Sequence, residues 1–155
     1  MKKKIIMISS IFILLDQIIK IIVRSSIKFE NEIFILPKFL YITNVGNTGG
    51  AFSIFSNNTA ILILIGIMVL AFIIKFIYNK KLKKIDVIIY GLLIGGIIGN
   101  LIDRIILNSV TDYIGLIFGS YYYPVFNLAD IGIVVSIMLL IFLEFRGDGN
   151  GNSSR

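Results

Sequence analysis

Four long apolar runs constrain the fold of this chain more than any other feature. Their approximate bounds are Ile5–Val23, Thr59–Tyr78, Ile85–Leu107 and Phe126–Phe145. A helix needs about 20 mostly apolar residues to cross the hydrocarbon core of a bilayer. Charged residues make up only 15% of the chain, below the share that is usual in soluble domains. We therefore predict an all-α membrane protein in which residues 1–155 form one domain with four transmembrane helices.

The first apolar run follows three lysines, as the apolar core of a cleavable signal peptide would. However, Asp16 and Lys20 interrupt the run, and no cleavage site of the small-x-small type follows it. We therefore expect this run to remain in the protein as the first helix.

The lysines predict the direction of the helices. They gather at Lys2–Lys4 and in the link 79–84, whereas the link 108–123 contains neither Lys nor Arg. Basic segments flank membrane helices on the cytoplasmic side. We therefore predict that both termini are cytoplasmic. The net charge of +6 then favours contact with membrane lipid, and we expect no nucleic-acid partner.

Several segments outside the helices have recognisable patterns. Ile33–Leu36 and Phe39–Thr43 are rich in β-branched and aromatic residues, which predicts two short strands and hence a small β element on the outer face. The remaining expectations are a turn at 44–50, an apolar segment on the membrane surface at 51–55, an interfacial aromatic belt at 121–124, and a disordered tail at 147–155.

The chain contains neither histidine nor cysteine. This excludes Ser-His and Cys-His nucleophile systems. A zinc or copper site would need carboxylates alone, which is unusual because those metals favour imidazole and thiolate ligands. Acid–base chemistry would have to use Asp, Glu, Lys or Tyr.

The strongly polar residues near the helices lie at one predicted depth, close to the outer surface, apart from those in the cytoplasmic flanks. Ionisable groups within a membrane are costly and usually functional. Asp16 and Lys20 have i, i+4 spacing and can pair, either at a functional site or only to orient helices. The other members of this group are Asn44, Asn47, Asn100, Asp103, Arg104, Asp112, Asn127 and Asp130.

Three glycines in the third run lie at four-residue steps, at 91, 95 and 99, and Asp103 continues their stripe. Small residues allow helices to pack closely in lipid. We interpret the glycines as packing residues that direct Asn100, Asp103 and Arg104 into the bundle.

Two carboxylates, Asp112 and Asp130, are candidates for catalysis. By itself, Asp112 could be a solvated loop acid or a helix cap. Asp130 lies within a predicted span, where a carboxylate is costly and its presence therefore needs a specific explanation. Two carboxylates held close together would share one proton, and such a pair can hydrolyse a peptide bond. The residues alone do not show that the two are adjacent.

Five short motifs follow one another along the chain. They are Asp16-Gln17-Ile18-Ile19-Lys20, Asn47-Thr48-Gly49-Gly50-Ala51-Phe52, the segment from Gly95 to Arg104, Val110-Thr111-Asp112-Tyr113-Ile114, and Phe126-Asn127-Leu128-Ala129-Asp130. With these motifs in this order, the chain resembles lipoprotein signal peptidase, also called signal peptidase II, over about residues 5–145.

The resemblance implies an aspartyl endopeptidase of the bacterial inner membrane with its active site near the outer face. Its substrates would be prolipoproteins, cut before a diacylglyceryl-modified cysteine. Asp112 and Asp130 match the catalytic dyad. The resemblance implies no metal and no cofactor, and we expect a monomer. The positions that match substrate-binding or supporting residues are Asp16, Lys20, Asn47, Gly49, Asn100, Asp103, Arg104, Asn127 and Ala129.

A small proton-coupled transporter is the alternative, because intramembrane acids and bases are also typical of transporters. It predicts polar residues spread across the membrane depth. The cytoplasmic half of the predicted bundle contains no such path, so the sequence favours the peptidase.

Overall fold

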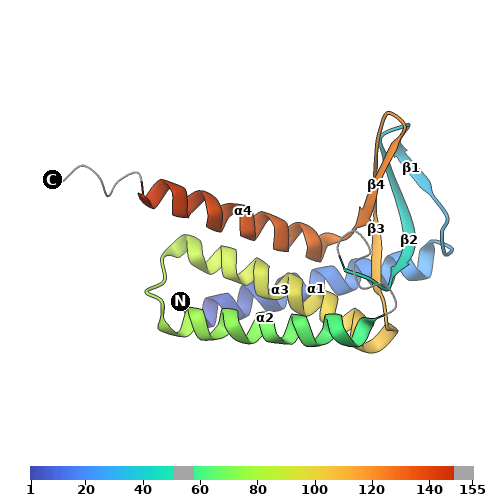
Figure 1. The fold of residues 1–155 in the computed structure, drawn as a ribbon. Helices are drawn as coiled ribbons and strands as arrows, with labels where there is room; N and C mark the ends of the chain where they lie inside the picture. The colour runs from blue at the N-terminus through green and yellow to red at the C-terminus, as the bar shows by residue number, and fades with distance from the viewer. Residues whose placement is uncertain (51–57, 149–155) are drawn as a thin grey trace.

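The computed structural model describes residues 1–50 and 58–148, and Figure 1 shows the fold. Each of its four helices is long and apolar enough to cross a membrane, as the four apolar runs predict. The helices are α1 (Lys2–Ser26), α2 (Thr59–Asn79), α3 (Lys84–Leu107) and α4 (Leu128–Asp148). The first three agree with the predicted spans to within one helical turn.

Both ends of the fourth helix differ from the prediction. Phe126 is the last residue of a strand, and α4 begins only at Leu128. At the other end, α4 continues to Asp148, so its last residues occupy the start of the predicted disordered tail. The rest of that tail, and the apolar segment predicted at 51–55, lie outside the described residues.

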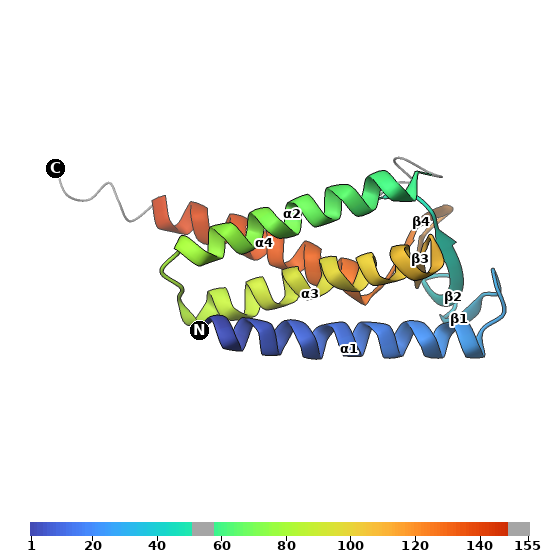
Figure 2. The same cartoon turned by 90° about the horizontal axis from the view of Figure 1, so that it is seen from below.

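α3 is the central helix. It packs against α1, α4 and α2, and Figures 1 and 2 show it between them. In α3, 61% of an 18-residue apolar stretch is buried inside the protein, whereas the share is 28% or less in the corresponding stretches of the other three helices. The outward faces of α1, α2 and α4 are apolar and exposed, as expected of helices that contact lipid.

The glycine stripe explains how closely α1 approaches α3. A Cβ added at Gly91 would lie 2.5 Å from Ile8 Cγ2, and one at Gly95 would lie 3.1 Å from the Ser9 carbonyl oxygen. The Ser9 hydroxyl donates a hydrogen bond to the Gly91 carbonyl oxygen at 3.0 Å. The predicted packing role of these glycines is confirmed.

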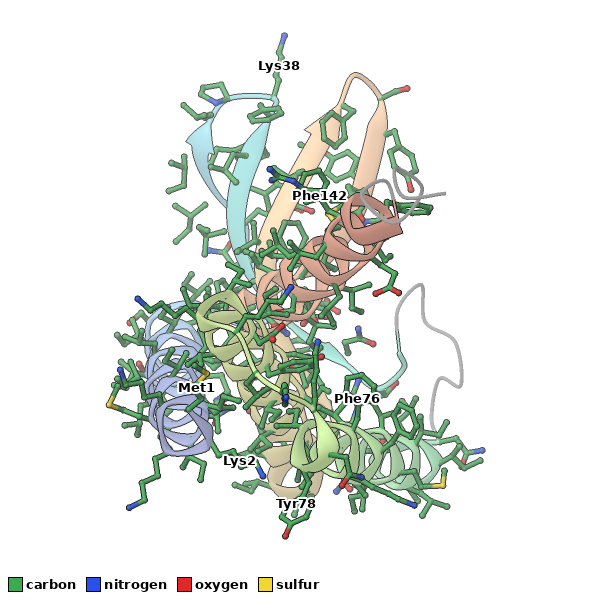
Figure 3. All side chains as sticks on the ribbon, turned by 90° about the vertical axis from the view of Figure 1, so that its left-hand side faces the viewer. Met1, Lys2, Lys38, Phe76, Tyr78 and Phe142 are labelled. Carbon is green, nitrogen blue, oxygen red and sulfur yellow. The ribbon has the colours of Figure 1, made fainter. Side chains whose placement is uncertain are left out.

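The end of the bundle that holds the N-terminus and the link between α2 and α3 is rich in lysine, and we call it the basic end (Figure 2). Here Lys2 donates a hydrogen bond to the Tyr78 carbonyl oxygen at 3.1 Å, which ties α1 to the end of α2 (Figure 3). The apolar core of this end consists of Ile5, Ile77, Val87, Tyr90 and Leu93.

A four-stranded antiparallel sheet lies at the opposite end, which we call the sheet end (Figure 1). The strands are β1 (Ile33–Leu36), β2 (Leu40–Asn47), β3 (Val110–Phe118) and β4 (Tyr121–Phe126), in that spatial order. The first strand is where the sequence predicts it. The prediction of a turn from residue 44 is wrong, because β2 continues to Asn47.

The second half of the sheet was not predicted. β3 and β4 form a hairpin in which Phe118 pairs with Tyr121, leaving a loop of Gly119 and Ser120. Gly119 has φ of +65°, which a two-residue hairpin loop requires and glycine adopts readily. The predicted aromatic belt at 121–124 is therefore part of a strand. Figure 3 shows Lys38 at the tip of the sheet, far from the helices.

Candidate active site

The start of α4 is fixed by two of its own side chains. The Asn127 Oδ1 accepts a hydrogen bond from the Asp130 amide at 2.9 Å, and Asp130 Oδ2 accepts one from the Asn127 amide at 3.2 Å. This is a reciprocal cap, in which Asn127 is the N-cap residue and Asp130 lies in the first turn. The cap holds the Asp130 carboxylate at the sheet end of the helix.

Two further amides of this first turn have partners from other elements. The Leu128 amide donates to the Tyr113 hydroxyl of β3 at 3.1 Å, and the Ala129 amide donates to Asp16 Oδ1 of α1 at 3.0 Å. Burial raises the pKa of Tyr113 to about 12, so its phenol stays neutral at pH 7. The free amides of a helix N-terminus favour a negative charge, which Asp16 supplies.

Asp112 lies on β3, opposite Val45 of β2, and is 2% exposed. Its two oxygens have different partners. Asn127 Nδ2 donates to Oδ1 at 2.6 Å, and Asn47 Nδ2 donates to Oδ2 at 2.9 Å. The Asp112 carboxylate is therefore held from both the sheet and the start of α4.

Asn100 and Asn127 connect the two carboxylates. Asn100 Nδ2 donates to Asp130 Oδ1 at 2.7 Å, while Asn127 Nδ2 is 3.2 Å from Asn100 Oδ1 and also donates to Asp112. Asn127 thus contacts both Asp112 and Asp130. The structure brings the two aspartates into one network, which the residues alone do not show.

The surroundings of Asp112 favour its protonated form. Burial raises the pKa of this carboxyl to about 7, and the neighbouring charge of Asp130 adds to the effect. Hydrogen bonds from Asn47 and Asn127, together with the positive charge of Lys20, oppose the rise. A buried carboxyl that titrates near neutrality beside a second carboxyl can exchange protons with a substrate and with water.

An ion cluster lies behind the two carboxylates. Lys20 is fully buried, and its Nζ lies 2.8 Å from Asp16 Oδ2 and 3.3 Å from Asp103 Oδ2. The same ammonium donates to Asn100 Oδ1 at 3.0 Å. The i, i+4 pairing of Asp16 with Lys20 is as predicted. It also links to the site, because Asn100 contacts Asp130.

Gln17 is a further member of this cluster and is not among the predicted site residues. Its Nε2 lies 3.1 Å from the Gly99 carbonyl oxygen, 3.2 Å from Asp103 Oδ1 and 3.3 Å from Asp16 Oδ2. The side chain therefore joins α1 to α3 beside the ion cluster. Its position next to Asp16 in the first motif could have identified it as a site residue.

Two glycines of α3 make room for these contacts. A Cβ at Gly99 would lie 2.6 Å from Asp16 Oδ2, and a Cβ at Gly96 would lie 2.5 Å from the Ala129 carbonyl oxygen. The first would displace the acid that caps α4. The second would displace the backbone that precedes Asp130.

Arg104 and Gly49 form the edge of the site next to β2. Arg104 Nη2 donates to the Gly49 carbonyl oxygen at 3.0 Å, and the Gly49 amide donates to Asn47 Oδ1 at 2.9 Å. The Arg104 Nε is buried and has no hydrogen-bond partner within residues 1–50 and 58–148. The last residues of the second motif, 51 and 52, lie outside this part of the chain.

These contacts join all the site residues predicted from the sequence into one connected network of hydrogen bonds and ion pairs. Asp130, predicted within the fourth span, lies in the first turn of α4, because this helix begins at Leu128 and not at Phe126. Four side chains in contact with the network were missed, although three of them belong to the motifs: Gln17, Arg24, Thr111 and Tyr113. Within the described ranges, no group of three or more His, Cys, Asp or Glu residues could hold a metal ion.

Comparison with protein families gives one match that covers most of the chain. The model described as signal peptidase (SPase) II matches residues 8–146. A lipoprotein signal peptidase of Clostridium acetobutylicum is 38% identical over 146 residues, which is 92% of this chain and 95% of that protein. One from Listeria monocytogenes is 36% identical over 140 residues, covering 88% and 89%.

Two solved structures have the same overall fold as this chain. A bacterial membrane enzyme matches with a TM-score of 0.88 and 28% identity, covering 97% of this chain and 93% of that one. A second bacterial membrane enzyme matches with a TM-score of 0.80 and 28% identity, covering 90% of each chain.

Proposed function

Because the chain belongs to the signal peptidase II family, whose members are aspartic peptidases, we propose that Asp112 and Asp130 are its catalytic dyad. The observation that carries this proposal is that one residue, Asn127, donates to both carboxylates in a largely buried site: its side-chain amide donates to Asp112 and its backbone amide to Asp130. The proposed substrates are prolipoproteins, cut before the diacylglyceryl-modified cysteine. The names of the relatives from Listeria and Clostridium support this substrate class.

In the proposed mechanism, the dyad carries one proton. The ionised carboxylate removes a proton from a water molecule, which attacks the scissile carbonyl carbon. The protonated carboxyl donates a hydrogen bond to the carbonyl oxygen and stabilises the developing negative charge. The proton taken from water then passes to the leaving amine as the carbon–nitrogen bond breaks. The peptide and one water molecule are the only reactants in this mechanism.

The surrounding residues have distinct proposed roles. Asn100 and Asn127 fix the two carboxylates. Arg104 holds the Gly49 carbonyl, and its Nε, which has no hydrogen-bond partner within residues 1–50 and 58–148, is its proposed donor to substrate. Asn47 orients Asp112 from the second strand.

A second group of residues supports the dyad indirectly. Asp16 caps α4 through the Ala129 amide, and Lys20 balances its charge together with that of Asp103. This arrangement keeps the start of α4, and thus Asp130, against α1 and α3.

We also propose that the protein lies in a bacterial cytoplasmic membrane with the sheet end, and hence the site, at the outer face. The support is the concentration of lysines at the opposite end of the helices. The transporter alternative is not retained, because the family is one of peptidases.

The decisive experiment is cleavage of a purified diacylated prolipoprotein by the reconstituted protein. Asp112→Asn and Asp130→Asn are each expected to lower the rate by about 10³-fold or more, because general acid–base catalysis is lost. Glu144→Gln is the matched control, since it removes an exposed acid from the same helix as Asp130 and should leave the rate unchanged. Wild-type activity in either Asn variant would remove that residue from the dyad.

A further inference from the structure

Arg24 lies in the last turn of α1, outside the motifs of the family resemblance. Its Nη1 donates a hydrogen bond to Thr111 Oγ1 of β3 at 2.8 Å and lies 3.8 Å from Asp103 Oδ1 of α3. The side chain is 31% exposed, whereas Asp103 and Thr111 are buried. A cation at the rim of the bundle therefore contacts two buried groups from different elements.

Thr111 immediately precedes Asp112 and is held at both its side chain and its backbone. The Thr111 amide donates to Asp103 Oδ2 at 2.9 Å, while its hydroxyl accepts from Arg24. Asp103 in turn pairs with Lys20 at 3.3 Å. The residue before Asp112 is thus tied to α1 and to α3.

The sheet supports this part of β3 from one side only. The pairing of β3 with β4 begins only at Ile114, which is opposite Phe126, so Asp112 has a strand on one side only. On that side, the register with β2 shifts between the pairs that involve Ile114 and Asp112. A bulge changes the direction of a strand and of its side chains. The ties to Thr111 therefore add support to a stretch of β3 that is paired with β2 alone and lies next to a register shift.

We propose that Arg24 is a positioning residue for the reaction, which holds Thr111 and thereby sets the Asp112 carboxylate in its place beside Asp130. This inference rests on the proposed function of that pair. Arg24 does not contact either carboxylate. It acts through the strand.

Charge balance gives a second reason for a cation at this position. Asp16 and Asp103 are both buried, and Lys20 is close to both. Arg24 is the second cation of the cluster, so the two acids are matched by two bases. Without it, the one ion pair left to Asp103 among the described residues would be with a lysine already paired with Asp16, and a buried acid with less than its matching positive charge is costly.

The first test separates kcat from KM in prolipoprotein cleavage. Arg24→Met is expected to lower kcat by about 10- to 100-fold with KM within twofold, because a misplaced catalytic group slows the chemical step. Arg24→Lys keeps a cationic donor and should recover most of the loss. Thr111→Val should lower kcat similarly, and the double variant should be no slower than Arg24→Met, since both act through one contact.

Lys28→Met is the matched control, because it removes an exposed cation just beyond α1 and should leave kcat unchanged. A kcat of Arg24→Met within twofold of wild type, or a change confined to KM, would overturn the proposal.

A second test does not depend on the substrate. Hydrogen exchange of the Thr111 and Asp112 amides should be at least tenfold faster in Arg24→Met than in wild type, with the β4 amides unchanged. Equal protection in both proteins would overturn the proposal. If wild type fails to cleave prolipoprotein but these amides do exchange faster, the hold on β3 stands and only the proposed function fails.

Discussion

Asp112 is buried next to a second carboxylate, and this makes its charge sensitive to pH near neutrality. Burial and the charge of Asp130 raise its pKa to about 7. Because the dyad needs one proton, we expect kcat/KM to fall as pH rises above about 7, where that proton is lost. A profile measured between pH 5 and 9 would show this descending limb, and constant activity up to pH 9 would contradict it.

The same shift predicts how stability depends on pH. The carboxyl binds its proton more tightly in the folded protein than in the unfolded chain, so between about pH 4 and 7 the folded state holds more protons. The free energy of unfolding should therefore decrease as pH rises through this window, by an amount of the order of a few kcal/mol. The Asp112→Asn variant is the control, since the contribution of this carboxyl to the slope should be absent from it.

The burial of Lys20 predicts that its charge contributes to the free energy of unfolding. It is fully buried between Asp16 and Asp103. Lys20→Met keeps the length of the side chain but leaves two buried acids without their shared partner. We expect the free energy of unfolding to fall by about 3–5 kcal/mol, measured by thermal or denaturant unfolding in detergent. Lys75→Met, on the exposed surface of α2, is the control and should have little effect, and equal losses in both would refute the structural role of the cluster.

At the scale of the elements, the contact between α3 and α4 sets the position of Asp130. A Cβ at Gly96 would lie 2.5 Å from the Ala129 carbonyl oxygen and 2.8 Å from Ile133 Cγ1. We expect Gly96→Ala to lower the free energy of unfolding by about 1–3 kcal/mol, as overpacking does. Cleavage should fall as well, because backbone atoms next to Asp130 would have to move.

Gly66→Ala is the matched control for this prediction. A Cβ there would lie 2.8 Å from Leu101 Cδ2, which is the end of a flexible side chain and can move. The smaller loss is therefore expected at Gly66. If the two variants are equally destabilised and equally active, the α3–α4 contact does not control the site.

The elements also show what local sequence patterns can predict. The helices follow from the length of the apolar runs, and the i, i+4 spacing of Asp16 and Lys20 predicts their pairing. The hairpin of β3 and β4 was missed, although Val110–Phe118 is rich in β-branched and aromatic residues and Gly119-Ser120 fits a two-residue loop. Residues 108–123 were interpreted only as a link between two helices, so their strand pattern was not used.

At the scale of the whole molecule, the helices have a basic end and a sheet end, and the lysines predict which side of the membrane each occupies. The chain has no cysteine, so single cysteines can be labelled without background. We expect a membrane-impermeant maleimide to label Ser120→Cys, in the hairpin loop, in intact spheroplasts. Lys83→Cys, in the link between α2 and α3, should react only after permeabilisation. The reverse pattern would invert the proposed orientation, and the cysteine-free parent protein is the control for specific labelling.

By itself, the sequence determined the features that depend on neighbours along the chain. These are the number and length of the helices, the spacing of the glycine stripe, and the asymmetry of the lysines. Its motifs also identified Asp112 and Asp130 as candidates, through the family resemblance. All of these depend on local spacing or on the order of short segments, which can be read directly.

Only the tertiary structure decided how the site is assembled. The Ala129 amide meets an acid 113 positions earlier in the chain, and Asn100 reaches an aspartate 30 positions later. No local pattern specifies such contacts, because they result from the packing of α1, α3 and α4 against one another and against the sheet. The packing explains why Asp112, a residue with the pattern of an ordinary loop acid, lies buried on β3 within reach of the same asparagine that caps Asp130.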